Sequence, residues 1–192
     1  MRIGVLGGSF NPPTNAHLEL SKNCIEQGFC DKVIWVPVND SYRKSTNIPA
    51  RNRLDMVKLA LKDEKDIGYS KHELYYDRIV RTFESLCILQ GYLPNDELLF
   101  IAGADKLGFR WMQKEEFISK FGYILVNRGD INCENIIDKS EVLKKYKSKI
   151  NILNYNSDIS STLVREEIVK LGSSSMVSDD VLKYIQVNHL YI

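Results

Sequence analysis

A short stretch near the start of the chain combines residue types that suit phosphate binding. Residues 7–17 read GGSFNPPTNAH and lie between an apolar run and a helical pattern. Glycines let backbone N–H groups approach a ligand closely, and the following helix N-terminus carries partial positive charge. Thr14 and His17 are three residues apart on the opening turn, so both side chains can face one phosphate. On spacing alone, a glycine turn followed by a capped helix fits equally well.

A second group of hydroxyl and basic residues lies far along the chain, where residues 159–165 read ISSTLVR. Hydroxyls at a helix start cap backbone N–H groups or donate to phosphate oxygens. Arg165, one turn further, offers a planar fork that suits a phosphate. Taken alone, this pattern is also that of an ordinary helix cap.

The elements that must position these two stretches alternate along the chain. Short apolar runs predict strands over residues 3–6, 33–38, 98–102, 123–126 and 150–153. The helical spacing of Leu18, Ser21 and Ile25, followed by Gly28, predicts a first helix, and Pro49 is expected to open a second. Further helices are expected over residues 79–90, 115–120, 161–171 and 178–188. Alternating strands and helices predict an α/β fold, a doubly wound parallel sheet with a small helical portion at the C-terminal end. Ligands of such sheets bind at the carboxyl ends of the strands.

Length, charge balance and cysteine usage indicate a single-domain globular protein and give no sign of a zinc site or of a nucleic-acid or membrane partner. The 192 residues suit a single domain, with residues 157–192 as a helical subregion. Lys plus Arg number 26 against 25 Asp plus Glu, which gives no reason to expect a nucleic-acid or membrane partner. The four cysteines form no CxxC pair and no zinc-like spacing with histidine, so reduced thiols in a cytoplasmic protein are expected, and no metal site.

The two stretches together resemble the signature motifs of the nucleotidylyltransferase superfamily. Gly8-x-Phe10-x-Pro12 followed by Thr14-x-x-His17 is similar to its first motif, and Ile159-Ser160-Ser161-Thr162-x-x-Arg165 to its second. The resemblance implies a Rossmann-like fold and transfer of a nucleotidyl group. The Ser-Ser-Thr form favours adenylyl over cytidylyl transfer. Ala16 departs from the glycine of many bacterial members.

Three further matches resemble the branch that adenylates pyridine mononucleotides. They are Gly103-Ala104-Asp105 with Trp111 after it, Val36-Pro37 followed by Lys44, Arg53 and Met56, and the Val181, Tyr184-Ile185 and Leu190-Tyr191 pattern near the C-terminal end. The resemblance implies that Asp105 lies near the adenosine ribose and that Trp111 stacks on the pyridine ring. The C-terminal Tyr and Leu residues are expected to pack in the core.

The segment before Leu86 departs from the branch. Nicotinate mononucleotide enzymes of bacteria often have S-Y-T-x-D-T-L there, and only Thr82 and Leu86 align with it here. Arg81 suits a carboxylate, or equally a solvated helix position. Asn11 replaces the Asp of many bacterial members. Acid versus amide preference therefore stays open at this point.

The resemblance implies transfer of an adenylyl group from ATP to nicotinate mononucleotide in NAD biosynthesis, with Mg²⁺ carried on the ATP. Nicotinamide mononucleotide, then 4′-phosphopantetheine, are the alternative acceptors, and a non-catalytic nucleotide-binding protein is a further alternative. A homo-oligomer is possible. The implied catalytic residues are His17, Thr14, Lys44 and Arg165. The implied ATP-binding residues are Gly8, Ser9, Phe10, His17, Gly103, Asp105, Ile159, Ser160, Ser161, Thr162 and Arg165, and the implied pyridine-nucleotide-binding residues are Asn11, Lys44, Thr82 and Trp111.

Overall fold

The fold is known from a computed structural model, which describes residues 1–42, 48–108, 112, 114–127 and 132–191. Lys44 and Trp111 lie outside the described residues. No helix within these ranges is long and apolar enough to cross a membrane.

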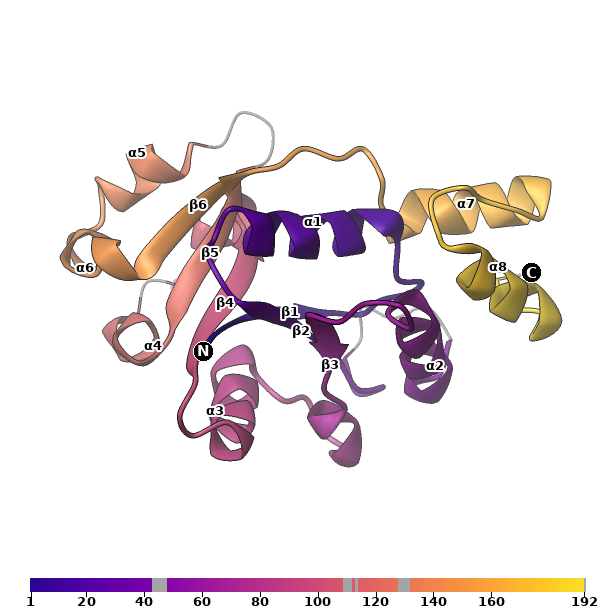
Figure 1. The fold of residues 1–192 in the computed structure, drawn as a ribbon, viewed down its shortest axis with the longest axis horizontal. Helices are drawn as coiled ribbons and strands as arrows, with labels where there is room; N and C mark the ends of the chain where they lie inside the picture. Colours follow the sequence, from indigo (N-terminus) through magenta and orange to yellow (C-terminus); the bar gives the residue numbers. More distant parts are fainter. Residues whose placement is uncertain (43–47, 109–111, 113, 128–131, 192) are drawn as a thin grey trace.

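A six-stranded sheet forms the centre of the molecule (Figure 1). Its order is β3-β2-β1-β4-β5-β6, and every neighbouring pair of strands is parallel. The chain therefore runs outward from β1 to β3, returns to β4 beside β1, and then runs outward to β6. The strands are β1 (Arg2–Gly8), β2 (Lys32–Pro37), β3 (Ile67–Tyr69), β4 (Glu97–Gly103), β5 (Gly122–Asn127) and β6 (Ile150–Asn154).

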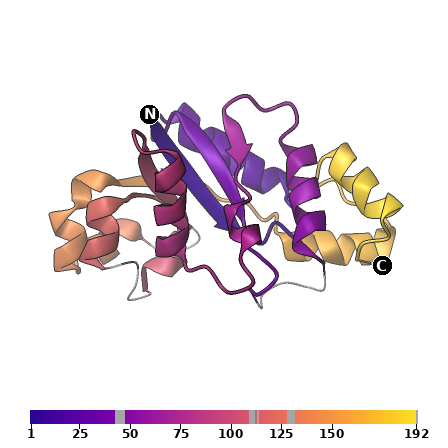
Figure 2. The ribbon, with the colours of Figure 1, turned by 90° about the horizontal axis from the view of Figure 1, so that it is seen from below.

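Helices cover both faces of the sheet, which confirms the predicted doubly wound fold. Buried residues of α1 and α2 share one apolar cluster, whereas those of α3 and α4 belong to another, so α1 and α2 cover one face of the twisted sheet and α3 and α4 the other. Figure 1 shows α7 and α8 beyond α2 at one end of the molecule. The same end is seen from below in Figure 2. The α-helices are α1 (Asn15–Glu26), α2 (Ala50–Ala60), α3 (Thr82–Tyr92), α4 (Glu115–Lys120), α5 (Cys133–Ile137), α6 (Glu141–Lys145), α7 (Ser161–Leu171) and α8 (Asp179–Val187). Short 3₁₀ helices lie at His72–Tyr75, Ala104–Gly108 and Lys147–Lys149.

Local signals in the sequence set several of these boundaries. Gly28 after α1 and Gly172 after α7 both have left-handed backbone conformations, with φ of 69° and 68°, which glycine adopts without strain. Ser178 caps α8, because its side chain accepts the backbone N–H of Val181. Ser160 caps α7 in the same way, accepting from Leu163.

The buried apolar residues fall into three clusters. One lies on the α3 and α4 face of the sheet, and a second contains residues of α1, α2 and both central strands. The third joins the two C-terminal helices to α2: Met56 of α2 is buried among Val164 and Ile168 of α7 and Val181 and Ile185 of α8. The C-terminal helices are thus attached to the sheet through α2 by apolar packing.

The structure differs from the sequence-based prediction in the bounds of one helix and in three elements that were not predicted. The helix expected over residues 79–90 is α3, which begins at Thr82 because Arg81 before it is extended, with ψ of 151°. The helix continues through Gly91 to Tyr92, beyond the expected end at residue 90. Strand β3 and the short helices α5 and α6 were not predicted.

Candidate active site at the switch point of the sheet

The two predicted motifs flank the point where the strand order reverses. Strands β1 and β4 are neighbours, but the chain leaves them in opposite directions across the sheet. Their carboxyl ends are Gly8 and Gly103. Open α/β sheets bind ligands in the crevice outside such a pair of strand ends, because the following loops separate there. Ser9 to His17 follow β1, and Ala104 and Asp105 follow β4, so both groups of predicted residues border this crevice.

His17 is held by the residue that precedes its helix. The backbone N–H of Thr14 donates to His17 Nδ1 over 3.1 Å, and the Thr14 hydroxyl lies 2.7 Å from the same nitrogen. Because Nδ1 accepts the backbone N–H, the neutral imidazole carries its proton on Nε2. The Thr14 hydroxyl consequently donates to Nδ1. The imidazole is half-buried and Thr14 is buried, so this contact fixes both the tautomer and the ring position.

Two aromatic rings pack against the His17 imidazole, those of Phe10 and Trp35. Phe10 stacks on Trp35 of β2 with ring centroids 4.8 Å apart, and the Phe10 and His17 centroids are 5.1 Å apart. The indole N–H of Trp35 donates to Ser21 Oγ, and that hydroxyl donates to the carbonyl oxygen of His17. Phe10 has a left-handed φ of 46°, an uncommon conformation for a bulky residue that the surrounding packing maintains.

The second motif contacts the first directly. Ser161 Oγ donates to the carbonyl oxygen of Pro12 over 2.8 Å. One terminal nitrogen of Arg165 donates to the carbonyl oxygen of Asn11 over 2.8 Å, and the other donates to Thr162 Oγ1 over 3.1 Å. Two side chains of the second motif thus fix two consecutive carbonyl groups of the first motif, which lie about 150 residues earlier in the sequence.

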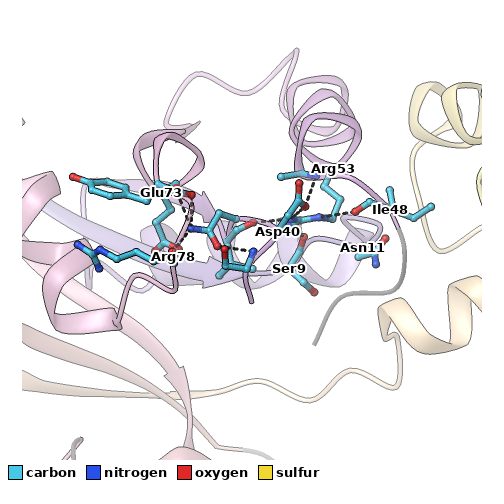
Figure 3. A network of polar contacts seen from close by, with 12 residues as sticks. Ser9, Asn11, Asp40, Ile48, Arg53, Glu73 and Arg78 are labelled. Carbon is cyan, nitrogen blue, oxygen red and sulfur yellow. Dashed lines mark hydrogen bonds and ion pairs between the residues drawn. The ribbon is translucent and has the colours of Figure 1, made fainter. Parts of the chain in front are cut away.

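Arg53 of α2 ties the first motif to the loop after β2, and Figure 3 shows this network. The side chain is fully buried. Its guanidinium donates to the carbonyl oxygens of Ser9, Val38 and Ile48 and to Asp40 Oδ1. Burial lowers the pKa of Arg53, and the hydrogen bond to Asp40 opposes that effect. Because Val38 and Ile48 flank the segment between β2 and α2, Arg53 joins the two described ends of that segment.

A buried amide connects the same loop to the segment before α3. Asn39 Nδ2 lies within hydrogen-bonding distance of three carbonyl oxygens, those of Glu73, Tyr76 and Arg78, the shortest at 2.6 Å. Its Oδ1 accepts the backbone N–H of Ser41. Figure 3 shows Glu73 and Arg78 at this end of the network. The segment leads into Thr82, which is half-buried as the first residue of α3.

Asp105 lies close to the end of β4. A Cβ atom on Gly103 would overlap the Asp105 carboxylate, so the carboxylate folds back over that glycine. Asp105 is exposed and pairs with Lys106. Glycine at position 103 therefore leaves room for this position of the Asp105 carboxylate, which a Cβ atom would displace.

The structure brings together most of the predicted residues, but not all of them. Gly8, Ser9, Phe10, Asn11, Thr14, His17, Ser161, Thr162 and Arg165 form one connected region through the contacts above. Ile159 precedes this region and is half-buried, while Ser160 serves as the helix cap. Among the described residues, no group of three or more His, Cys, Asp or Glu side chains is placed to hold a metal ion.

Four residues of the region received no functional role from the sequence. Trp35 and Asn39 were not singled out, Arg53 was only part of a family match, and Tyr191 was expected to pack in the core. Arg53 had a usable signal, because it occupies the apolar stripe of α2 with Ala50, Leu54 and Val57. A charged residue in such a stripe is buried only when it has polar partners.

Comparisons with known proteins agree with this geometry. Residues 5–167 match the Cytidylyltransferase-like family. The chain is 34% identical to a probable nicotinate-nucleotide adenylyltransferase of Carboxydothermus hydrogenoformans, over 99% of this chain and 98% of that protein. It is 27% identical to the nicotinate-nucleotide adenylyltransferase of Bacillus subtilis, over 99% and 98% of the two chains.

Among solved structures, the nicotinic acid mononucleotide adenylyltransferase of Plasmodium falciparum complexed with NaAD is similar in fold. Its TM-score is 0.77 at 20% identity, covering 99% of this chain and 97% of that one. The full-length match to the curated relatives, together with the two motifs meeting at the switch point, assigns the protein to the nicotinate-nucleotide adenylyltransferase family.

Proposed function

We propose that the protein transfers the adenylyl group of ATP to nicotinate mononucleotide. A 5′-phosphate oxygen of the mononucleotide attacks the α-phosphorus of ATP, and the bond from that phosphorus to the β-phosphate oxygen breaks. The products are the deamido form of NAD and pyrophosphate. Such a transfer depends on positioning and charge neutralisation rather than on a protein nucleophile.

One observation carries the proposal most directly, namely the contact between the motifs. Ser161 and Arg165 of α7 donate to the backbone of Pro12 and Asn11, in the loop that follows β1. The hydroxyls, the guanidinium and the His17 imidazole are thereby gathered at the crevice where this fold binds nucleotides. Three kinds of hydrogen-bond donor in one place suit an anion with several oxygens.

His17 is the residue that we assign to the α-phosphate. Its Nε2–H is a preorganised donor, because Thr14 holds the opposite side of the ring. Such a donor stabilises negative charge that develops on the non-bridging oxygens during transfer. The Thr14 hydroxyl acts through the imidazole in this arrangement, since it contacts Nδ1.

We assign the binding of the outer phosphates of ATP to five residues: Ser160, Ser161, Thr162, Arg165 and Lys44. A guanidinium has five N–H donors, and the contacts with Asn11 and Thr162 use two of them. Mg²⁺ accompanies ATP as part of the substrate, because it retains several waters and binds mainly through phosphate oxygens. The adenosine is assigned to Gly8, Ser9, Phe10, Gly103, Asp105 and Ile159.

The acceptor is assigned to Asn11, Lys44, Thr82 and Trp111. A pyridine ring suits the flat apolar face of a tryptophan. A carboxylate on the ring gains charge-assisted hydrogen bonds from backbone N–H groups or from Arg81, which directly precedes α3. A carboxamide brings its own donor and no charge, so nicotinate mononucleotide is the preferred acceptor.

The proposal is tested by measuring pyrophosphate release from Mg-ATP with three acceptors: nicotinate mononucleotide, nicotinamide mononucleotide and 4′-phosphopantetheine. We expect the highest kcat/KM with nicotinate mononucleotide and the lowest with phosphopantetheine. Trp111→Ala should reduce the use of both pyridine nucleotides. A preference for phosphopantetheine that Trp111→Ala leaves unchanged would contradict the assignment of the acceptor.

Substitution of His17 and Thr14 tests the catalytic arrangement. His17→Ala removes the Nε2–H donor and should lower kcat about 10²- to 10³-fold. Thr14→Val keeps the backbone N–H that holds Nδ1 and removes only the hydroxyl, so its kcat should fall less. Near-normal turnover in His17→Ala would overturn the role of the imidazole.

Three further predictions stay untested. They are a cytoplasmic location, a single domain with residues 157–192 as its helical subregion, and assembly as a homo-oligomer. Size-exclusion chromatography with light scattering measures the last of these.

A further inference from the structure

Asn39 lies between the first motif and the segment that leads into α3. The residue before it, Val38, donates its backbone N–H to the carbonyl oxygen of Gly8 over 3.0 Å and accepts a hydrogen bond from Arg53. The Asn39 amide instead contacts residues 73–78, which follow β3. Two consecutive residues thus connect the loop after β1 with the segment before α3.

The backbone of this segment is held by side chains from the loop after β2. Asn39 Nδ2 lies within 3.2 Å of three carbonyl oxygens, those of Glu73, Tyr76 and Arg78. Ser41 Oγ donates to the carbonyl oxygen of Asp77 over 2.7 Å. Because Asn39 is 4% exposed, water cannot readily replace its amide as the donor to these carbonyl groups.

Arg78 extends these contacts to the first turn of α3. Its carbonyl oxygen is 2.6 Å from the Asn39 amide nitrogen, and its guanidinium donates to both carboxylate oxygens of Glu84. A forked pair of this kind fixes orientation as well as distance. Asn39 is therefore connected to the start of α3 through a single residue.

The start of α3 suits an anionic group. Arg81 before it has an extended backbone, and its side chain does not cap the helix. Backbone N–H groups in the first turn of a helix have no partner within the helix and carry partial positive charge. The Arg78 guanidinium offsets the charge of Glu84, which would otherwise oppose an anion there. The carboxylate of nicotinate mononucleotide is an anion of the required kind.

We infer that Asn39 is a positioning residue for the acceptor, because its amide holds the segment that ends at Thr82. The inference rests on the proposed function, in which Thr82 contacts the pyridine mononucleotide. Asn39 acts through the backbone of the segment, so its own side chain needs no contact with substrate. The sequence before Leu86 departs from the S-Y-T-x-D-T-L pattern, and the Asn39 contacts give this different sequence a fixed backbone.

The test is Asn39→Asp, read as KM for nicotinate mononucleotide, KM for ATP, and kcat. The aspartate keeps the shape of the side chain and an acceptor for the backbone N–H of Ser41, but it has no N–H donor for the three carbonyl oxygens. KM for the mononucleotide should rise about 10-fold, and KM for ATP should change less than about 2-fold. The preference for nicotinate over nicotinamide mononucleotide should also fall, because the carboxylate loses fixed donors.

Gln90→Glu is the matched control, because Gln90 makes the same kind of contact near the other end of α3. Its Nε2 donates to the carbonyl oxygens of Leu93 and Asp96, in the loop that leads into β4. Both variants should unfold at a lower temperature than the wild type, but Gln90→Glu should keep the wild-type KM for the mononucleotide. Equal increases of that KM in the two variants would contradict the inference.

Ser41→Ala is a milder second variant. The half-buried Ser41 side chain makes one contact with the segment, so its removal should allow folding and raise KM for the mononucleotide about 2-fold. If Asn39→Asp does not fold, an unchanged KM for the mononucleotide in Ser41→Ala overturns the inference.

Two further results would overturn the inference while leaving the proposed function intact. They are an unchanged KM for the mononucleotide in folded Asn39→Asp, and equal increases of KM for the mononucleotide and for ATP in that variant. The proposed function fails separately, when the wild-type protein does not release pyrophosphate with nicotinate mononucleotide.

Discussion

The carboxylate of Asp105 folds over Gly103, and a side chain at position 103 would displace it. Gly103→Ala should therefore move Asp105 and raise KM for ATP about 5-fold, the effect of one lost hydrogen bond. Because Asp105 is exposed, the free energy of unfolding should change little. Gly68→Ala in β3 is the control, since a Cβ there has no atom within 4 Å. An unchanged KM for ATP in Gly103→Ala would remove Asp105 from the adenosine site.

Glu73 is a buried carboxyl group in the segment that precedes α3. Burial raises its pKa from 4.5 to about 7, against a smaller lowering by Ser85. Between pH 4.5 and 7 the folded protein keeps this proton while the unfolded chain releases it. The free energy of unfolding contributed by Glu73 should therefore fall as pH rises through this window, by about 3 kcal/mol in total, and change no further above it.

Glu73→Gln cannot ionise, so it should remove that contribution. Urea unfolding of the wild type and of Glu73→Gln from pH 5 to 8 gives two free energies of unfolding at each pH. The pH dependence of their difference measures the contribution of Glu73. His72 makes the opposite contribution in both proteins. Burial lowers its pKa, so the unfolded chain binds its proton more readily below about pH 6.5, and its contribution to the free energy of unfolding rises with pH in that range. Taking the difference cancels the His72 contribution. Parallel curves for the two proteins would show that Glu73 ionises equally in the folded and unfolded states.

The sequence alone was sufficient to single out candidate site residues that lie in local motifs. Thr14, His17, Ser161 and Arg165 lie in short patterns whose spacing is visible in the printed sequence. Tyr191 could not be assigned in the same way, because its partner Asn11 is 180 residues away and only the fold brings them together. A tyrosine beside an apolar residue predicts packing, and nothing in the pattern specifies the acceptor for its hydroxyl.

At the level of elements, α2 contributes more than an apolar face. Its Arg53 donates to the carbonyl oxygens of Val38 and Ile48 and to Asp40 on the two sides of the segment after β2, and to the carbonyl oxygen of Ser9 in the first motif. Arg53→Met retains a long apolar side chain but leaves these carbonyl groups without their donor. We expect a loss of about 3 to 5 kcal/mol of stability and a raised KM for both substrates.

Two controls separate these effects of Arg53. Arg51→Met on the same helix removes an exposed charge and should be nearly neutral. Asp40→Asn should cost less than Arg53→Met, because the Asp40 side chain is 61% exposed. If Arg53→Met is as stable as Arg51→Met, the buried guanidinium does not hold the loop.

The elements that the sequence predicted badly share a physical reason. Strand β3 has only three residues, one of them Gly68, so its pattern is too short to show alternation. The start of α3 was placed too early because Ile79 and Val80 extend its apolar pattern, whereas the backbone of Arg81 is extended. Parallel pairing with β2 and the Asn39 contacts fix these segments, and both depend on distant parts of the chain.

For the whole molecule, the apolar cluster between α2, α7 and α8 links stability to the site. Ile185→Ala creates a cavity in this cluster and should cost about 2 to 5 kcal/mol. Because α7 carries Ser161 and Arg165, KM for ATP should rise as well. Leu143→Ala, a fully buried residue of α6 in the cluster under α4, should cost a similar amount and leave KM for ATP unchanged.

Urea unfolding and steady-state kinetics on the two variants measure both quantities. Equal KM values for ATP in the two variants would mean that the C-terminal cluster supports the fold without supporting the site.

The distance along the chain between the two halves of the site has a consequence for how the protein is made. A ribosome synthesises residues 1–154, and with them all six strands, before it reaches Ser161, Arg165 and Tyr191. A nascent chain can therefore assemble the sheet while the loop after β1 still lacks its partners in α7 and Tyr191. The capacity to bind nucleotide would then arise only after Ser161 and Arg165 have been synthesised, and a chain whose synthesis stops after β6 would bury much of its core without acquiring a place for ATP.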